Sequence, residues 1–501
     1  MPPSINLGVG NTCAGVITQI VATGSMDKFL TENAVKTYWK AKYERTTCFS
    51  MEFVTQPFTS QVAFGQTSQV TLNRTGDLIY HMYVLIHLPG IVAEEPQSNS
   101  TMRSQFPVGD NSTIYKADCN VYADYCNEKE VAVEAIESAN SGDSHSAKTV
   151  LEKGKARWLA ESYASGYDAS WQPEEEELPE TWACWSNSIG HLAIKCASLV
   201  IGGSTIDTLY SDFLFMWEEL SGKSGKRLSE LIGKHANRQE LICASQRARI
   251  LHVPLPFFFT QHPSQALSLA SLQFHGVQLV VEFERLENCI QVSRSDLAVT
   301  NCSTGNPITS TDINAAVDTT YIYLSTEERQ KFSSMQFEQL ITQVQQYTMT
   351  STASNLRFAL SFNHPIIELL VGVRRACNEK TNNWFNYTGI DGLDPVKNIS
   401  LLFNNQTRFN NVTPEIMRIR TPYECHSNIP DFVGIYVLSF ALHPESIQPS
   451  GTANFSRIDH VDMQINLQDG LGKEQVTVMV FAKSYNLLRY RQGLAGLGFA
   501  N

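Results

Sequence analysis

The stretch Val253–Phe283, VPLPFFFTQHPSQALSLASLQFHGVQLVVEF, carries the clearest signal for the fold. It closes on Val277–Phe283, a run of β-branched and aromatic residues with only two polar members, which is the composition of a half-buried strand. Pro254 and Pro256 cannot donate hydrogen bonds within a sheet, so the apolar run Phe257–Phe259 is expected at a strand start or on a sheet edge. The stretch therefore predicts two strands joined across the end of a β-sandwich, with an irregular apolar loop as the alternative.

A weaker copy of part of this stretch occurs later in the chain. The motif Phe259–Pro263, FTQHP, is echoed by Phe440–Pro444, FALHP. The first copy is followed by the strand-like run that starts at Val277. The second copy is followed by Val461–Leu467, which alternates apolar and polar residues with a period of two. The repeat indicates a duplicated domain.

The composition is that of an acidic, globular chain. Its 501 residues are too many for one ordinary core, and 43% of them are hydrophobic. The formal net charge of −12 argues against direct nucleic-acid binding, which needs a basic surface. The 11 cysteines form no C-x-x-C motif, so reduced thiols are expected. Because no signal peptide and no apolar run of about 18–20 residues are found, we expect a soluble chain without a transmembrane segment.

Changes in composition divide the chain into four parts. Residues 1–25 are rich in Gly and Thr and are expected to form an extended N-terminal arm. Residues 26–288 are expected to form the first β-domain, interrupted at about residues 91–182 by a polar, acidic insertion with two predicted helices. Residues 289–318 are rich in Ser, Thr and Asn and are expected to be a linker. Residues 319–501 are expected to form the second β-domain.

Strands are predicted where β-branched and aromatic residues gather or alternate with polar ones. These runs are Phe49–Val54, Leu78–Leu88, His191–Ile201, Thr319–Leu324, Phe337–Met349, Leu356–Phe362, Ile366–Val373, Ile435–Leu442, Val461–Leu467 and Val476–Tyr485. Asp207–Leu220 has the spacing of a helix. Cys377–Asn411 is rich in Asn and is expected to be a loop, and Arg489–Asn501 is expected to be a Gly-rich tail.

Motifs of catalytic or cofactor chemistry are absent from the sequence. Gly222–Lys226 resembles a phosphate loop, but two residues separate its glycines where four are needed, and Arg227 follows the lysine in place of Ser or Thr. His262 and His443 each precede a proline, so structural turns are expected there. No catalytic residue, cofactor site or metal site is therefore predicted, and the chain is not expected to be an enzyme.

Sequons for N-glycosylation are frequent in the Asn-, Ser- and Thr-rich segments. We expect most of them to be coincidental, because the sequence carries no recognisable signal peptide. Asn99, Asn111 and Asn386 are the candidate glycosylation sites.

Several segments together resemble the major capsid proteins of nucleocytoplasmic large DNA viruses, most closely those of algal viruses. The matching segments are Asp27–Thr31, Tyr43–Arg45, Asn73–Ile79, Val253–Phe259, Phe362–His364, Pro449–Asp459 and Ala482–Arg489. They follow the family order over nearly the whole chain, and Pro449–Asp459, PSGTANFSRID, is the most specific of them. The insertion at residues 91–182 departs from the family pattern, because it is much longer than in the chlorella virus relatives.

The resemblance implies an all-β fold of two tandem eight-stranded antiparallel jelly rolls, with short helices and a long loop insertion in the first. It implies a structural major capsid protein that forms homotrimeric, pseudo-hexagonal capsomers, and these tile a large icosahedral virion shell. The expected partners are other copies of the chain, neighbouring capsomers and minor capsid proteins, with an internal membrane nearby. Assembly is expected in the host cytoplasm.

A β-sandwich carbohydrate-binding protein or hydrolase is the alternative. A hydrolase would need two carboxylates placed across a cleft. The sequence leaves room for such a pair in the insertion.

Overall fold

The structure is a computed structural model that describes Val21, Asn33, Trp39 and residues 43–95, 180–222, 226, 228–294, 297–471 and 474–499. Residues 49–501 form one compact unit, distinct from residues 1–48. The predicted N-terminal arm, apart from Val21, and the two predicted helices of the insertion lie outside the described residues.

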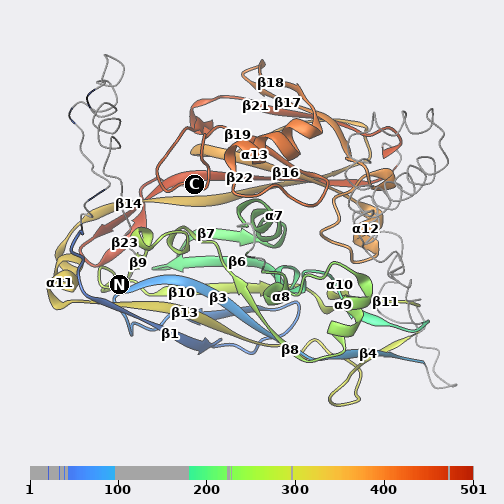
Figure 1. Cartoon of the computed structure of the whole chain (residues 1–501), viewed down its shortest axis with the longest axis horizontal. Coiled ribbons are helices and arrows are strands. Elements are labelled where there is room, and N and C mark those ends of the chain that lie inside the picture. Colours follow the sequence, from blue (N-terminus) through green and yellow to red (C-terminus); the bar gives the residue numbers. More distant parts are fainter. Residues whose placement is uncertain are drawn as a thin grey trace, which may run out of the picture. The chain divides into compact units, whose positions relative to one another are not determined.

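The first half of this unit, residues 49–324, is built on two antiparallel sheets (Figure 1). In sheet A the strands lie in the order β1-β13-β3-β8, and the short β9 also pairs with β3. In sheet B the order is β2-β10-β6-β7. The bounds are β1 Phe49–Pro57, β2 Thr67–Thr71, β3 Leu78–Leu88, β6 Ile194–Ile201, β7 Ser204–Tyr210, β8 Arg249–Pro254, β9 Leu267–Ser268, β10 Val277–Phe283 and β13 Asn314–Leu324.

The second half, residues 337–497, also has two antiparallel sheets. Sheet C has the order β14-β22-β16-β19, with β20 paired to β16 and β23 to β22. Sheet D has the order β15-β21-β17-β18. The bounds are β14 Phe337–Ser351, β15 Asn355–Ala359, β16 Pro365–Arg375, β17 Val396–Phe403, β18 Gln406–Val412, β19 Ile435–Ser439, β20 Ala453–Asn454, β21 Val461–Leu467, β22 Val476–Arg491 and β23 Leu494–Leu497.

The two halves repeat one strand order. Sheet A corresponds to sheet C and sheet B to sheet D, strand for strand, and the pair β9–β3 corresponds to β20–β16. Phe259 follows β8 and Phe440 follows the corresponding strand β19, so the two copies of the F-x-x-H-P motif occupy matching corners. The duplication predicted from that motif is confirmed.

Helices occupy the same connection in both halves. Between β7 and β8 lie α7 Ser211–Ser221, α8 Ser229–Ile232 and α9 Arg238–Ser245. Between β18 and β19 lie the π-helix η4 Ile416–Arg420 and α13 Thr421–Cys425. The remaining short helices are α6 Ile189–Ala193, η1 Phe258–Thr260, η2 Pro263–Gln265, α10 Leu286–Cys289, α11 Thr326–Ser334, α12 Ala376–Lys380, η3 Ile390–Gly392 and η5 Phe455–Arg457.

Two small antiparallel sheets lie where the insertion leaves the first half. Strand β4 Ile91–Glu94 pairs with β12 Ala298–Asn301, and β5 Ala183–Trp185 pairs with β11 Ile290–Val292. Strands β4 and β5 also contact each other. The described residues on either side of residues 96–179 therefore end and resume at neighbouring strands.

The stretch Val253–Phe283 folds only partly as expected. Val277–Phe283 is strand β10, with buried and half-buried residues in alternation, as predicted. The prediction that Phe257–Phe259 lies at a strand start or on a sheet edge is wrong, because the chain turns there into the 3₁₀-helix η1. The Thr260 hydroxyl lies 3.1 Å from the Leu255 carbonyl oxygen and 3.0 Å from that of Phe257, and donates a hydrogen bond within this turn. The turn places all three phenylalanine rings fully inside the core.

The predicted linker at residues 289–318 is also wrong. It contains β11, β12 and the start of β13, Asn314–Asp318, and β13 pairs with both β1 and β3. The first half therefore ends after Leu324, since sheet A is completed only by β13. A Ser-, Thr- and Asn-rich segment forms strands here because neighbouring strands supply its hydrogen-bond partners, which local composition does not record.

Three further predictions need correction. Cys377–Asn411 is not a loop throughout, since it contains α12, β17 and most of β18. Arg489–Asn501 includes the end of β22 and all of β23. The helix predicted from Asp207 begins only at Ser211, after β7.

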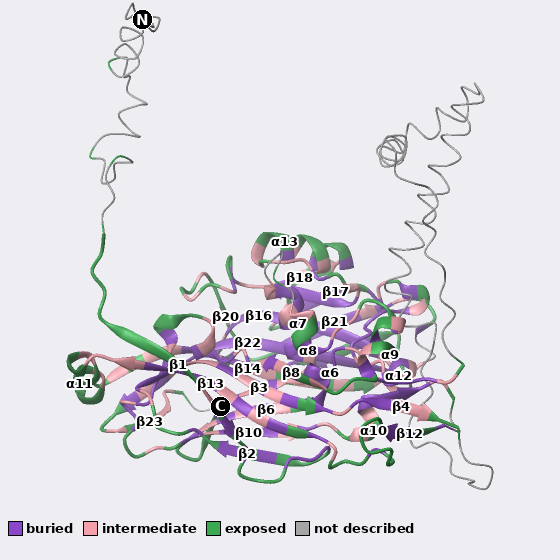
Figure 2. Ribbon diagram, turned by 60° about the horizontal axis from the view of Figure 1, so that its bottom comes forward, coloured by how far each residue is buried: buried purple, intermediate pink, exposed green. Residues whose placement is uncertain are grey.

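Strand β22 is buried on both faces, from Val476 to Asn486. Val478 and Val480 face the core of the second half, whereas Met479 and Phe481 belong to the core that includes the first half. Figure 2 shows that β22 is buried, whereas β1 is largely exposed.

The buried phenylalanine turn gives a stability prediction. Replacing Phe258 by Ala should lower the free energy of unfolding by about 3–5 kcal/mol, because a fully buried ring leaves a cavity. The matched control is Phe274→Ala, which removes an exposed ring and should change the free energy by less than about 0.5 kcal/mol. Denaturant titration of both variants tests this, and equal effects would contradict it.

Candidate functional site: the contact between the two halves

The outer face of sheet C, which points away from sheet D, is covered by the first half of the same chain. Strand β7, the edge strand of sheet B, and helix α7, which follows it, lie against sheet C (Figure 1), and β7 contacts β14. The Phe213 ring of α7 lies 5.9 Å from that of Phe481 on β22. Met216 of α7 packs so closely on Gly372 of β16 that a Cβ at residue 372 would collide with its methyl carbon. Burial of this face joins the two halves.

Helix α7 is suited to this place because it is apolar almost all the way round. Its sequence is SDFLFMWEELS, and a helix apolar on all sides is normally buried. Asp212 lies in the first turn, where a negative charge stabilises the helix dipole. The Phe215 ring stacks on Phe385 with 4.4 Å between centroids and also contacts Phe432. Aromatic side chains of the two halves thereby pack together around Phe215.

Polar groups fix the position of β7 and α7 on sheet C. Arg374 of β16 is buried and lies 2.8 Å from Asp212, which also accepts a 2.7 Å hydrogen bond from the Tyr387 hydroxyl. Asp207 of β7 accepts a 2.9 Å hydrogen bond from the Val344 amide of β14. Burial raises the pKa of Asp207 to about 7, although backbone amides partly offset the shift. These bonds define one register between the halves.

A buried charged cluster lies beside α7. His426 sits between two carboxylates, with Nε2 2.9 Å from Glu368 and Nδ1 3.0 Å from Glu445. Lys483 is also buried, donates a 3.0 Å hydrogen bond to the Pro444 carbonyl, and places Nζ 3.7 Å from the centroid of the Trp217 ring of α7. Two positive and two negative groups thus meet at the boundary between the halves.

The cluster shifts the pKa values of its members. Burial alone would lower the pKa of His426, but Glu368 and Glu445 outweigh it and raise the pKa to about 9. Burial lowers the pKa of Lys483 to about 8, although the same carboxylates oppose the change. Burial would raise the pKa of Glu445, but hydrogen bonds from His426 and Ser427 bring it below its ordinary value. At neutral pH His426 and Glu445 therefore form a charged pair.

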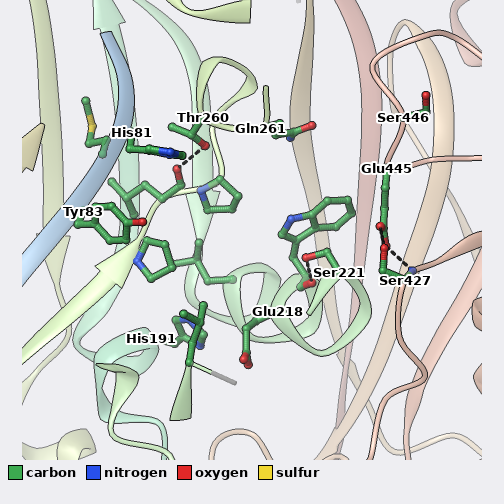
Figure 3. A pocket seen from close by; sticks show the side chains of 17 residues that line it. His81, Tyr83, His191, Glu218, Ser221, Thr260, Gln261, Ser427, Glu445 and Ser446 are labelled. Atoms are coloured by element: carbon green, nitrogen blue, oxygen red, sulfur yellow. Dashed lines mark hydrogen bonds between the residues drawn. The ribbon is translucent and has the colours of Figure 1, made fainter. Parts of the chain in front are cut away.

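A cavity of about 610 Å³ lies next to this cluster, between β3, α7 and the Ser427–Ser446 region (Figure 3). Its lining includes Glu218 and Glu445, the only carboxylates among the described lining residues. Glu445 already accepts hydrogen bonds from Ser427, and burial raises the pKa of Glu218 to about 7. The two carboxylates of this lining thus differ, since Glu445 is engaged in hydrogen bonds and Glu218 has a pKa raised by burial.

Groups that could hold a metal are absent from the part of the chain that the structure describes: no cluster of three His, Cys, Asp or Glu side chains occurs there. Within the same described residues, no helix is long and apolar enough to cross a membrane. Among the candidate glycosylation sites, Asn99 and Asn111 lie outside the described residues. Asn386 is buried, and its Oδ1 accepts a 3.0 Å hydrogen bond from the Thr388 amide. That position suits a structural role better than a glycan.

Comparison with protein families divides the chain at the same place as the strand order. Residues 328–496 match the family model described as "Large eukaryotic DNA virus major capsid protein". Residues 37–108 and 158–325 match "Major capsid protein N-terminus". The chain belongs to the major capsid proteins of large eukaryotic DNA viruses. These are structural, non-enzymatic proteins of the virion shell.

Curated relatives of this capsid protein include capsid proteins of algal viruses. The major capsid protein of Pyramimonas orientalis virus is 28% identical over 513 residues, covering 97% of this chain and 100% of that protein. The major capsid protein of Paramecium bursaria Chlorella virus 1 is 26% identical over 541 residues, with the same coverage.

Solved capsid structures show the same fold. A chain of the quasi-atomic PBCV-1 capsid superposes with a TM-score of 0.64 at 21% identity, covering 93% of this chain and 100% of that one. The Faustovirus major capsid protein gives a TM-score of 0.62 at 12% identity, covering 95% and 96%. The fold is therefore the double jelly roll of capsid proteins.

Sequence reasoning identified the family but not the contact between the halves. The helix of α7 was predicted, yet its partners Phe385, Phe481 and His426 lie far away in sequence. The one local signal was the apolar character of Phe213–Leu220 on every side, which indicates a helix buried on all faces.

The charged cluster gives a pH prediction. The pKa of His426 rises from an ordinary 6.5 to about 9 in the folded protein, so its contribution to stability is complete below pH 6.5 and is lost as pH rises through 9. A shift of this size corresponds to about 3 kcal/mol. The stability advantage of the native protein over His426→Gln should therefore shrink by about that amount between pH 6 and pH 9.5, as measured by denaturant titration. An advantage that stays constant with pH would show that His426 carries no charge in the folded state.

Proposed function

We propose that this major capsid protein forms a homotrimeric, pseudo-hexagonal capsomer and that these capsomers tile the icosahedral shell. The repeated strand order carries the proposal. Each chain supplies two similar halves, so three chains around a three-fold axis supply six similar units. A six-unit ring suits a hexagonal lattice, and closed rings are the usual form of homo-oligomers.

We further propose that each half is one eight-stranded jelly roll. Sheets A and B form the first and sheets C and D the second, joined by α11. The insertion then lies on the outward end of the first jelly roll. The proximity of β4 and β5 supports this, because the sandwich closes without the residues between them.

The remaining partners follow from the capsomer. Its flanks would contact neighbouring capsomers and minor capsid proteins, and its base would face an internal membrane after assembly in the host cytoplasm. The net charge of −12 fits a shell that makes no direct contact with nucleic acid. Asn99 and Asn111 stay predicted glycan positions on the insertion.

Light scattering tests the trimer. Full-length protein should give a mass of about three times 56.0 kDa, and negative-stain images should show hexagonal particles. A chain that stays monomeric at high concentration and retains full thermal stability would contradict the proposal.

A further inference from the structure

Both surfaces that form the contact between the halves have equivalents elsewhere in the same chain. Within the chain, β7 and α7 of the first half cover the outer face of sheet C. The corresponding elements of the second half are β18, η4 and α13, and the sheet that corresponds to sheet C is sheet A. If the contact were repeated from one chain to the next, η4 and α13 would lie on the outer face of sheet A.

Helices η4 and α13 present an apolar surface to solvent. Ile416, Ile419 and Tyr423 are 39%, 41% and 77% exposed. Their spacing of three and four residues places them on one side of the helical segment. The other side packs on the second half through Met417 and Pro422, which are buried. The exposed side is thus a surface that the second half itself leaves uncovered.

Sheet A presents a matching apolar surface on β1. Phe49, Met51 and Phe53 are 62%, 51% and 69% exposed. They share one face because alternate residues of a strand point the same way. The register pairs Phe53 with Thr320 and Val54 with Thr319. Val54 packs against the core, and so do Val317 and Tyr321, which lie on the same face of β13 as Thr319 and so mark the inner face. The three exposed residues therefore lie on the outer face.

The same outer face continues to the opposite edge of sheet A. Ile250 of β8 is exposed and pairs with His87 of β3, whose neighbours Ile86 and Leu88 are buried in the core. Apolar side chains therefore occur at both margins of this face.

We infer that these two surfaces bind each other between copies of the chain. The surface of Ile416, Ile419 and Tyr423 on one copy packs against that of Phe49, Met51 and Phe53 on the next, as α7 packs on sheet C within one chain. The inference rests on the proposed trimer and names the surfaces that close it. Each copy uses two different surfaces, so the contact is head-to-tail and can close into a ring.

A second copy is the occupant that the structure favours for both surfaces. Covering only one of them, for example by residues 1–48 of the same chain, would leave the other apolar surface exposed. Contiguous exposed apolar surface on a soluble protein usually marks a binding site. A ring covers both surfaces with a single contact.

The test uses two full-length variants. Ile419→Glu with Tyr423→Glu alters the helical surface, and Phe53→Glu alters the sheet surface. Each variant should lose the trimer and give a mass of 56.0 kDa, because a buried carboxylate without a partner is costly. Phe274→Glu, at an exposed ring outside both surfaces, is the matched control and should stay trimeric.

Mixing the two variants tests the head-to-tail geometry. Phe53→Glu keeps an intact helical surface and the double variant keeps an intact sheet surface, so the mixture should form dimers of about twice 56.0 kDa that cannot close. A mixture that stays monomeric, or variants that remain trimeric, would overturn the inference. Loss of the trimer in Phe53→Glu alone would show that the helical surface takes no part in the contact, and it would also overturn the inference.

Two controls keep the outcomes distinct. If the unaltered protein is monomeric, the trimer itself fails, whereas trimeric variants overturn only the assigned surfaces. Thermal unfolding checks that the variants fold, since all three altered side chains are exposed within one chain. If a Glu variant does not fold, the Ala variants at the same positions replace it and should weaken association in the same pairwise pattern.

Discussion

Burial of the outer face of sheet C beneath β7 and α7 is the interaction on which the rest of the structure depends. The buried apolar side chains of this face are Leu370, Ile435, Val437, Met479 and Phe481. Burying one such side chain contributes about 1.5–3 kcal/mol, so the five contribute on the order of 10 kcal/mol. That is comparable with the net stability of a whole domain. A second half without this cover would expose a large apolar face, so the chain behaves as one folded unit.

The polar groups at this boundary set the geometry of the contact. Apolar burial is non-directional and would allow several arrangements of two sandwiches. The ion pair of Arg374 with Asp212 and the hydrogen bond from Val344 to Asp207 are satisfied in one arrangement. Removing one member of the cluster around His426 would leave a buried charge without a partner, which typically costs about 3–5 kcal/mol. A shell subunit benefits from such a contact, because lattice assembly requires a fixed angle between its two halves.

The sequence predicted elements whose signal is local. The predicted bounds are correct for the strands Leu78–Leu88, Val277–Phe283 and Val461–Leu467. In each of them a run of apolar residues is bounded by residues that end strands. The hairpin of β17 and β18 was missed in the Asn-rich segment. Asn404 and Asn405 form its two-residue turn with φ of 49° and 63°, so the two asparagines were themselves the available signal.

The contact between the halves could not be predicted, because its members are distant in sequence. Lys483 lies on Trp217 and His426 bridges Glu368 and Glu445, and no local pattern joins these residues. The strand at Thr319–Leu324 was predicted, but composition gave no sign of its start at Asn314–Asp318, which pairs with β1 and β3. The family could still be recognised, because its short motifs do not depend on contacts between residues that are distant in sequence.

Native-state hydrogen exchange tests the central claim, that the two halves fold as one unit through sheet C. Amides of β10 and β6 in the first half and of β16 and β22 in the second should exchange with the same free energy, equal to that of global unfolding. If the amides of β16 and β22 exchange with a clearly lower free energy while β10 and β6 stay protected, the second half opens independently. That result would contradict the account.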